Sequence, residues 1–219
     1  MVKVKVFLVY TVIFAMIGGI ISISSGHWNS TLVWVYAGVL GAILIADDSS
    51  KVCEDTKTKD ESPGNQDYFM VWLFFPLLIS HWIVAGLDIG RFHWSDVIPF
   101  SWQIVGLGGL IIAFVLARWA ITVNRFYSGV IRLQKERGHY VISEGPYQYV
   151  RHPAYASLML IYACSGLALG SWWSFLPMGL LFLINLRRIL LEDRFLQENL
   201  PGYTDYAAKV PSRLIPGIW

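Results

Sequence analysis

Long uncharged runs separated by polar segments dominate the sequence. Runs without any Asp, Glu, Lys or Arg cover residues 6–25, 26–46, 68–87 and 97–117. Crossing about 30 Å of hydrocarbon takes roughly 20 apolar residues in a helix. Each run is therefore predicted to form a membrane-spanning helix. Pro76 interrupts the third run, which is tolerable where neighbouring helices satisfy the freed backbone groups.

A fifth uncharged run, residues 153–186, is too long for one straight span. Its 34 residues would extend about 51 Å at roughly 1.5 Å per residue. The run must fold back, and Gly170-Ser171 followed by Trp172-Trp173 is the natural corner, because glycine breaks a helix and tryptophan favours the membrane interface. The pattern thus predicts an all-α, multi-pass transmembrane bundle of five to six segments, the last two forming a tight hairpin.

The basic residues predict how this bundle is oriented. With the N-terminus inside, 15 of the 17 lysines and arginines fall on the inner side, Arg118 lies at the inner end of the fourth run, and only Arg91 lies in an outer loop. This meets the positive-inside rule. The first run exceeds a signal-peptide core and has no small-x-small cleavage signal, so we expect it to be retained. Both termini should be cytosolic, in the cell membrane if the source is prokaryotic.

Composition excludes two broad classes. Only 15% of residues are charged and 55% are apolar, against roughly 25% charged in an ordinary soluble domain, which excludes a soluble single-core enzyme. A net charge of +2 without a long basic run excludes a nucleic-acid binder. Cys53 and Cys164 have neither metal-site spacing nor the density of a disulfide scaffold.

The polar segments differ in what they offer. Residues 47–67 form an acidic loop with few apolar positions, expected to be a solvated connector; Asp47-Asp48 has no further carboxylate at a helpful spacing for a metal. Residues 118–152 and 187–219 flank the hairpin and hold most of the polar functional groups. We therefore divide the chain into N-terminal helices with the acidic loop (1–117) and a chemistry-bearing core (118–219).

The segment before the hairpin is dense in groups suited to ligand binding. Gly145-Pro146 can present exposed backbone donors, and Pro153 suits the first turn of the following helix. Arg151 and His152 then stand at a helix N-terminus, a setting that favours an anion. The alternative is interfacial anchoring.

Tyrosines in the same segment fit either interpretation. Tyr147, Tyr149 and Tyr155 suit an interfacial aromatic belt as well as a binding site. His152 and Tyr155 are three residues apart, so on a helix both point to one face.

After the hairpin, Arg188 and Glu192 share a helical face. They are either an exposed ion pair or a charged pair that engages a zwitterionic cofactor. Elsewhere, the glycines of residues 106–109 indicate close helix packing. His27, His81 and His93 lie on different segments and are expected to make local hydrogen bonds rather than bind metal.

The ordered motifs of the second half resemble a known family. They are Gly138-His139, Gly145-Pro146-Tyr147, Arg151-His152-Pro153-x-Tyr155, Arg188 with Glu192-Asp193, Tyr203-x-x-Tyr206 and Arg213-Leu-Ile-Pro216. Over residues 124–219 the chain resembles the isoprenylcysteine carboxyl methyltransferase and phospholipid methyltransferase superfamily.

That resemblance implies an integral membrane enzyme that takes S-adenosylmethionine from the cytosol and a lipophilic or prenylated acceptor from the bilayer. The segment before the hairpin and the polar tail would enclose the cofactor. It implies these cofactor-binding residues: His139, Val141, Gly145, Tyr147, His152, Tyr155 and Glu192. Arg188 and Glu192 would be catalytic, and Arg188 and Asn124 would hold the acceptor. Where relatives often have two glutamates, this chain has Glu192-Asp193, which leaves the role of the second acid open.

The sequence leaves open which methyl acceptor is used, and two other functional classes are compatible with it. The sequence offers no dedicated general base, which favours an isoprenylcysteine-type carboxylate or a thiol over a phospholipid amine that must first lose a proton. Membrane sterol reductases, which use NADPH, share a similar Arg-His-Pro-x-Tyr region. A non-enzymatic membrane scaffold or transporter is the third reading.

Overall fold

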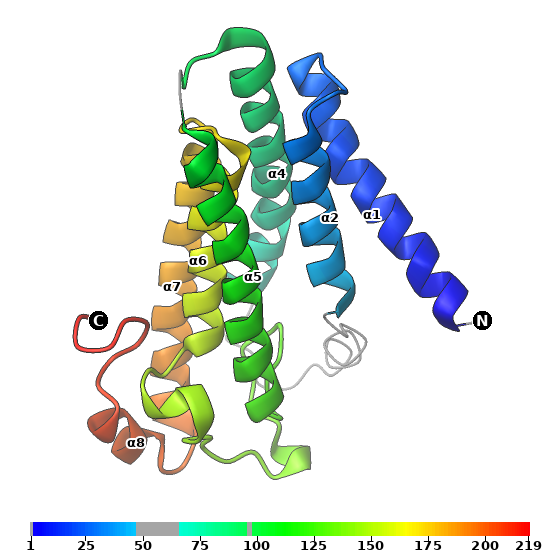
Figure 1. Cartoon of the computed structure of the whole chain (residues 1–219). Helices are drawn as coiled ribbons and strands as arrows, with labels where there is room; N and C mark the ends of the chain where they lie inside the picture. Colours follow the sequence, from blue (N-terminus) through cyan, green and yellow to red (C-terminus); the bar gives the residue numbers. More distant parts are fainter. Residues whose placement is uncertain (1, 47–65, 96–97) are drawn as a thin grey trace. The chain divides into compact units, whose positions relative to one another are not determined.

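The computed structural model describes residues 2–46, 66–95 and 98–219, and every regular element in these ranges is helical (Figure 1). The predicted all-α class is confirmed. Most of the predicted acidic connector, with Asp47-Asp48 and Cys53, lies outside the described residues, whereas Gln66 and Asp67 already belong to a helix.

The helices follow the predicted apolar runs. They are α1 (Val2–Ser25), α2 (Thr31–Ala46), α4 (Gln66–Leu87), α5 (Phe100–Val123), α6 (Pro153–Leu169), α7 (Phe175–Asn199) and the short α8 (Tyr203–Lys209). A π-helical turn, η1 (Asp88–Phe92), continues α4, and two 3₁₀ turns, η2 (Lys135–Arg137) and η3 (Gly145–Gln148), lie between α5 and α6.

Among the described residues, three helices are long and apolar enough to cross a membrane by themselves. The stretches are Leu8–Ser25, Trp72–Phe92 and Phe100–Val123; Thr31–Ile43 and Pro153–Leu169 are shorter apolar helices. These lengths support a membrane protein, while the number of crossings stays a prediction.

Two predicted boundaries need correction. Residues 26–30 form the connection before α2 rather than its first turn, and α5 continues past Arg118 to Val123. An uncharged run marks the part of a helix that lipid can surround. It does not mark where the helix ends, because a long basic side chain near the membrane edge can extend towards water.

The chain folds into two compact units. Unit 1 comprises Met1–Asp48, Leu73–Phe114 and Leu160–Phe182; unit 2 comprises Ser49–Trp72, Val115–Met159 and Leu183–Trp219.

Unit 1 has an apolar core in which helices pack closely. Ile17, Ile21 and Leu110 are fully buried in it. At Gly106 of α5 an added Cβ would lie 2.4 Å from the backbone nitrogen of Ala168 in α6, so this contact exists only because residue 106 has no side chain. The prediction that the glycines of residues 106–109 serve helix packing is confirmed for Gly106 and for Gly109, which lies against Cys164, but not for Gly108, which has no atom within 4 Å of an added Cβ.

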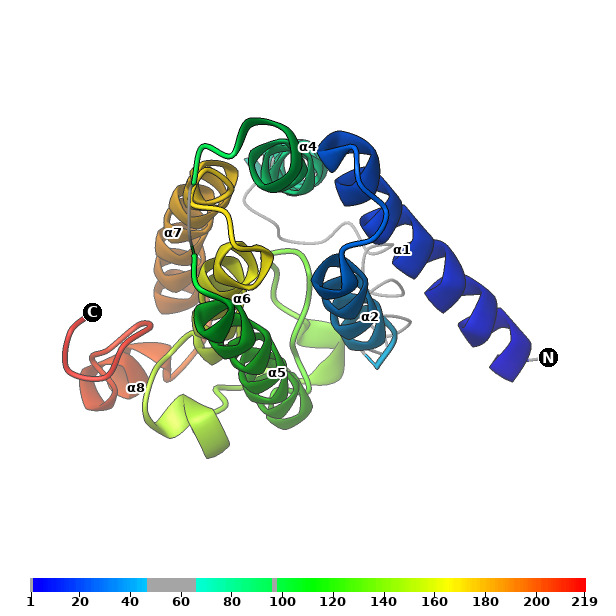
Figure 2. The same ribbon diagram turned by 45° about the horizontal axis from the view of Figure 1, so that its top comes forward.

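The hairpin corner lies where the sequence predicts it. Gly170 follows the last residue of α6 with a left-handed φ of 74°. Its N–H donates to the Leu167 carbonyl, and the Ser171 N–H donates to that of Gly166, at 3.1 and 3.2 Å. This pair of bonds closes a helix C-terminus that needs glycine, and α7 then begins at Phe175 (Figure 2).

A buried hydrogen-bond chain crosses unit 1. The Trp82 indole donates to the Tyr36 hydroxyl (3.1 Å), which is bonded to Ser165 (2.6 Å). His81 Nε2 contacts Ser165 at 2.7 Å, and its Nδ1 donates to the Ser174 carbonyl at 3.0 Å. His81 therefore makes hydrogen bonds within the protein, as predicted, but its partners lie 84 and 93 residues away in sequence.

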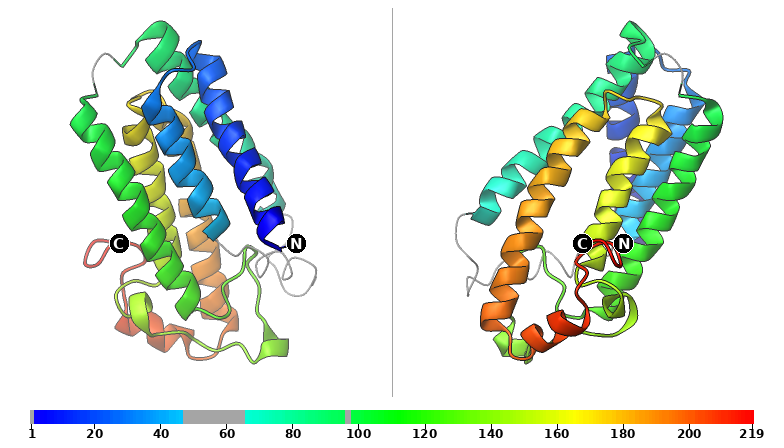
Figure 3. Two further views of the ribbon diagram at one scale, coloured as in Figure 1. Left: turned by 45° about the vertical axis from the view of Figure 1, so that its right-hand side comes forward. Right: turned by 90° about the vertical axis from the view of Figure 1, so that its left-hand side faces the viewer.

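Unit 2 joins the turns of residues 124–152 to the C-terminal tail (Figure 3). The tail pairs with the chain just before α6: the Arg151 N–H donates to Ser212 and the His152 N–H donates to Arg213, at 3.0 and 2.9 Å. A second apolar cluster underlies this unit, and its buried members are Ala120, Leu133, Tyr147, Leu200, Tyr203 and Tyr206.

Candidate functional site

Asp193 of α7 is the centre of the polar network in unit 2. Its carboxylate is almost fully buried and forms a bidentate pair with the Arg151 guanidinium, Nε to Oδ1 at 2.9 Å and the terminal nitrogen to Oδ2 at 3.0 Å. Such two-pronged pairing fixes geometry as well as charge.

Further donors complete the shell of Asp193. They are His152 Nε2 (3.3 Å), the Tyr203 hydroxyl (3.0 Å), Arg213 Nε (3.0 Å) and the Gln197 amide (3.1 Å). Burial alone raises the pKa of Asp193, but hydrogen bonds and charge from His152 and Arg151 outweigh it and hold that pKa well below its usual value. Protein groups thus occupy the hydrogen-bonding positions of the Asp193 carboxylate.

The network ties the tail to α7. Arg151 uses its remaining terminal nitrogen to donate to the carbonyls of Val210 and Pro211, at 2.8 and 2.9 Å. The sequence left the role of Asp193 open, and no local pattern reveals it, because its partners Arg151 and Arg213 lie 42 and 20 residues away. Asp193 organises the site.

A second chain of hydrogen bonds joins the three residues that sequence reasoning placed near the chemistry. Arg188 Nε donates to the Tyr155 oxygen at 2.7 Å, and the Tyr155 hydroxyl donates to Glu192 Oε2 at 2.8 Å. Arg188 also donates to the Gly129 carbonyl. Arg188 and Glu192 therefore share a face as predicted, with a phenol oxygen bridging them.

His152 lies next to this chain. Its ring meets that of Tyr155 edge to face, with centroids 5.9 Å apart, so the predicted common face is confirmed. His152 also caps α6, since its carbonyl accepts the Ala156 N–H at 3.0 Å. Pro153 is the first helical residue, as its fixed φ favours.

The Gly145-Pro146 turn forms η3 and places Tyr147 in the core. Gly145 has a φ of 56° and lies against Val123, which an added Cβ would meet at 3.0 Å. Burial raises the pKa of Tyr147 well above its usual value. Its carbonyl accepts the Tyr206 hydroxyl at 2.7 Å, so the tail is held to this turn too.

Asn124 is committed to the protein at both ends of its amide. Its Nδ2 donates to the Tyr147 hydroxyl at 3.2 Å, and its Oδ1 accepts the Phe126 N–H at 3.0 Å. These contacts close the turn after α5 and position Tyr147.

His139 lies in a polar and aromatic setting, with Val141 following it at the edge of the apolar cluster. Its Nδ1 accepts the Gln134 N–H at 3.3 Å, and its ring stacks on Phe126 with centroids 4.4 Å apart. Burial, with the charges of Arg132 and Arg137, lowers the pKa of His139 despite the opposing charge of Glu136. The neutral ring then carries its proton on Nε2.

Comparison with known proteins identifies the family. The sequence model of the phospholipid methyltransferase family matches residues 102–201. The probable protein-S-isoprenylcysteine O-methyltransferase of Oryza sativa subsp. indica is 30% identical over 158 residues, covering 63% of this chain and 78% of the rice protein. The chain belongs to the isoprenylcysteine carboxyl methyltransferase and phospholipid methyltransferase superfamily.

A second relative of this superfamily has a lower sequence identity. Protein-S-isoprenylcysteine O-methyltransferase B of Arabidopsis thaliana is 26% identical over 158 residues, which span 67% of this chain and 66% of that protein. The expected superfamily is thereby confirmed, and the chain is a membrane methyltransferase.

A methyltransferase of this superfamily must bind a methyl donor. Two side chains of unit 2 have polar atoms that could hydrogen-bond to such a ligand. Within the described ranges, the Glu192 carboxylate is bonded only by Tyr155, through Oε2, and the only hydrogen bond of the His139 ring uses Nδ1. Glu192 Oε1 can accept from a cationic ligand, and His139 Nε2 can donate to a heteroatom. Each of these atoms suits a polar ligand group, and that of Glu192 suits a cationic one, whereas Asp193 is already saturated. Among the described residues, no contact joins His139 to Glu192.

Proposed function

We propose that this protein transfers a methyl group from S-adenosylmethionine to the carboxylate of an isoprenylcysteine-type lipophilic acceptor. The observation that carries the proposal is the hydrogen-bonded chain Arg188–Tyr155–Glu192. It holds a cation and an anion in one rigid group, which suits a zwitterionic, cationic donor beside an anionic acceptor.

The cofactor side of the site would use the segment before the hairpin together with α7. The proposed residues are His139, Val141, Gly145, Tyr147, His152, Tyr155 and Glu192. When bound, S-adenosylmethionine supplies a sulfonium methyl group that is already activated for displacement. Glu192 would accept from its ammonium group, His139 Nε2 would donate to a heteroatom, and the Gly145 turn would let backbone approach closely. His152 and Tyr147, held by Asp193 and Asn124, would shape the walls.

On the acceptor side, Arg188 would pair with the carboxylate. Because both ends of the Asn124 amide contact protein, we assign Asn124 to positioning Tyr147 rather than to direct acceptor binding. A carboxylate is anionic at neutral pH and needs no general base. The residues then contribute mainly orientation and exclusion of water, and well-aligned reactants alone can lower a barrier by several kcal/mol.

We further propose that residues 118–219 form the methyltransferase core and that its polar segments face the cytosol. The positive-inside distribution of lysine and arginine supports this orientation. The acceptor would then enter from the bilayer and the donor from water.

Amine methylation is the second candidate, because the matching family model is that of phospholipid methyltransferases. An ammonium acceptor must lose a proton before it can attack, and Glu192 is the carboxylate whose free oxygen could take it. The charge of Arg188 argues against this acceptor, since it would repel an ammonium group.

The experiment that separates these candidates supplies methyl-labelled S-adenosylmethionine and compares acceptors. Purified protein in phosphatidylcholine nanodiscs is incubated with N-acetyl-S-farnesylcysteine, phosphatidylethanolamine or a small thiol. We expect base-labile label on the farnesylcysteine, as a methyl ester gives, and loss of that label in Arg188→Gln. Label on the amine lipid instead would establish the second candidate, and no label on any acceptor would overturn both.

A further inference from the structure

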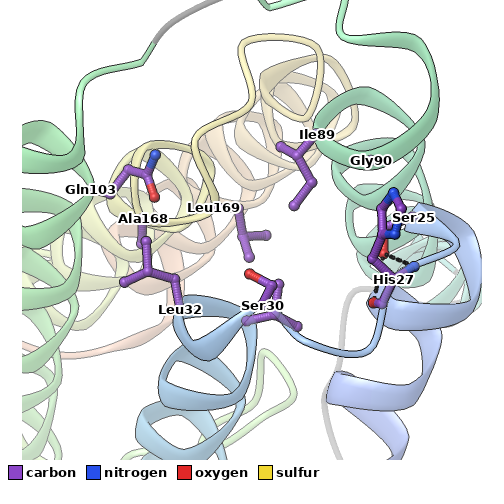
Figure 4. Close-up of a pocket in the computed structure, with 10 residues that line it drawn as sticks. Ser25, His27, Ser30, Leu32, Ile89, Gly90, Gln103, Ala168 and Leu169 are labelled. Carbon is purple, nitrogen blue, oxygen red and sulfur yellow. Dashed lines mark hydrogen bonds between the residues drawn. The ribbon is translucent and has the colours of Figure 1, made fainter.

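Unit 1 contains a cavity among the connections at one of its ends (Figure 4). It has a volume of about 210 Å³ and lies between the start of α2, the end of α6, η1 and α5. Its apolar wall is formed by Leu32, Val33, Ile89, Ala168 and Leu169. It is smaller than the roughly 300–1,000 Å³ of ordinary ligand pockets, so it would enclose only the head end of a long-chain molecule.

Three lining residues, Gln103, Ser30 and the exposed His27, have side-chain polar atoms without a hydrogen bond among the described residues. Gln103 donates its amide nitrogen to the Ile98 carbonyl at 3.1 Å, which leaves its Oε1 as the end directed elsewhere. Within the described part of the chain, neither Gln103 Oε1 nor the Ser30 hydroxyl has a hydrogen-bond partner. Figure 4 shows the oxygens of Gln103 and Ser30 facing the space between them.

The character of the lining selects the head group of a ligand. The lining contains no Asp, Glu, Lys or Arg, and its histidine, His27, is exposed to solvent. An ionic head would therefore enter without a permanent buried counter-charge, which is strongly unfavourable away from water. Gln103 Oε1 accepts only, so the ligand must donate. The Ser30 hydroxyl both donates and accepts. A hydroxyl group on the ligand satisfies both side chains, whereas an ester or a hydrocarbon does not.

We propose that this cavity binds the hydroxyl end of an uncharged aliphatic molecule, a site separate from the methyltransferase residues of unit 2. The hydroxyl donates to Gln103 Oε1 and exchanges a hydrogen bond with Ser30. The first carbons of the ligand's aliphatic chain lie against the apolar wall that includes Leu32 and Leu169, and the rest of that chain extends into lipid. A long-chain alcohol or the free hydroxyl of a glyceride has this chemistry.

Photolabelling tests the site directly. The full-length protein in phosphatidylcholine nanodiscs is exposed to hexadecanol that carries a diazirine near its hydroxyl, and labelled residues are mapped by mass spectrometry. We expect label on Leu32, Ile89 or Leu169 that unlabelled hexadecanol suppresses and that hexadecane and palmitate leave in place. Equal suppression by all three competitors, or no label on these residues, would overturn the proposal.

Variants separate the hydrogen bonds from the apolar wall. Ser30→Ala and Gln103→Leu should each reduce competable labelling by roughly two- to tenfold, the effect of one hydrogen bond, while Ser101→Ala, an exposed residue of α5, should not. Leu32→Trp should fill the cavity and abolish labelling, whereas Val35→Trp, on the exposed side of the same helix, should not. Thermal unfolding confirms that each variant is folded. If a variant does not fold, the competition experiment on the wild-type protein still tests the proposal.

Discussion

At the scale of single residues, the site separates side chains that hold the structure from side chains that remain able to bind. Asp193 is saturated by Arg151, His152 and the tail, whereas Glu192, its neighbour in sequence, is bonded only by Tyr155 among the described residues. Adjacent acids on one helix point to different partners because α7 turns about 100° per residue. Their substitution should therefore have different consequences.

Asp193→Asn should reduce stability strongly. The change leaves the Arg151 guanidinium, with only 4% of its side chain exposed, without its counter-ion, and breaking a buried pair in this way costs about 3–5 kcal/mol. Thermal or denaturant unfolding in detergent measures the loss. Glu198→Gln, an exposed change on the same helix, should alter stability by less than about 0.5 kcal/mol.

The same carboxyl gives a pH dependence. Because the folded-state pKa of Asp193 is depressed, its contribution is present above the unfolded value of 3.8 and is lost as pH falls below it. Wild type should lose this stability in acid and Asp193→Asn should not. An Asp193→Asn protein as stable as wild type at neutral pH would show that the network does not hold the tail.

Tyr155→Phe should impair catalysis more than stability. It removes the oxygen that bridges Arg188 and Glu192, and each lost hydrogen bond to a charged group is worth about 1.5–3 kcal/mol. We expect kcat/KM for methyl transfer to fall by roughly ten- to a hundredfold, with circular dichroism unchanged. Tyr149→Phe, at a residue that is 62% exposed, serves as the control. Wild-type kcat/KM in Tyr155→Phe would contradict the bridging role.

At the scale of elements, the sequence predicts the helices well and their partners poorly. Apolar runs locate the six long helices of the described ranges, and Gly170 locates the hairpin corner, because both signals are local. The sequence places the end of α5 wrongly because a charge does not end a helix. It places the start of α2 wrongly because residues 26–30 are uncharged and yet form a connection that begins at Gly26, with a φ of 76°. The Asp193 network and the His81 chain join segments far apart in sequence, so no periodicity reveals them.

Gly106→Ala should destabilise unit 1, because the new Cβ would lie 2.4 Å from the Ala168 backbone and must push α5 from α6. Overpacking of this kind typically costs about 1–3 kcal/mol. Gly108→Ala is the matched control, since nothing lies within 4 Å of its added Cβ. Unfolding in detergent should rank Gly108→Ala at or above wild type and Gly106→Ala below it. Equal stability of the two variants would mean that the α5–α6 contact is not close.

At the scale of the whole molecule, charge predicts the orientation in the membrane. With Cys53 and Cys164 replaced by alanine, cysteines are introduced at the exposed positions Lys209 and Trp172. An impermeant thiol reagent should label Trp172→Cys in intact cells and Lys209→Cys only after lysis, because basic segments are retained inside. The reverse pattern would place the core on the wrong side for cytosolic S-adenosylmethionine.

The most direct test of the central claim is calorimetric titration of the protein in nanodiscs with S-adenosylmethionine. We predict saturable binding to wild type, weaker binding to Glu192→Gln, which keeps the shape but loses the charge, and no binding of NADPH. Absence of binding to wild type, equal affinity in Glu192→Gln, or saturable binding of NADPH instead would contradict the assignment of residues 118–219 as a methyl-transfer site.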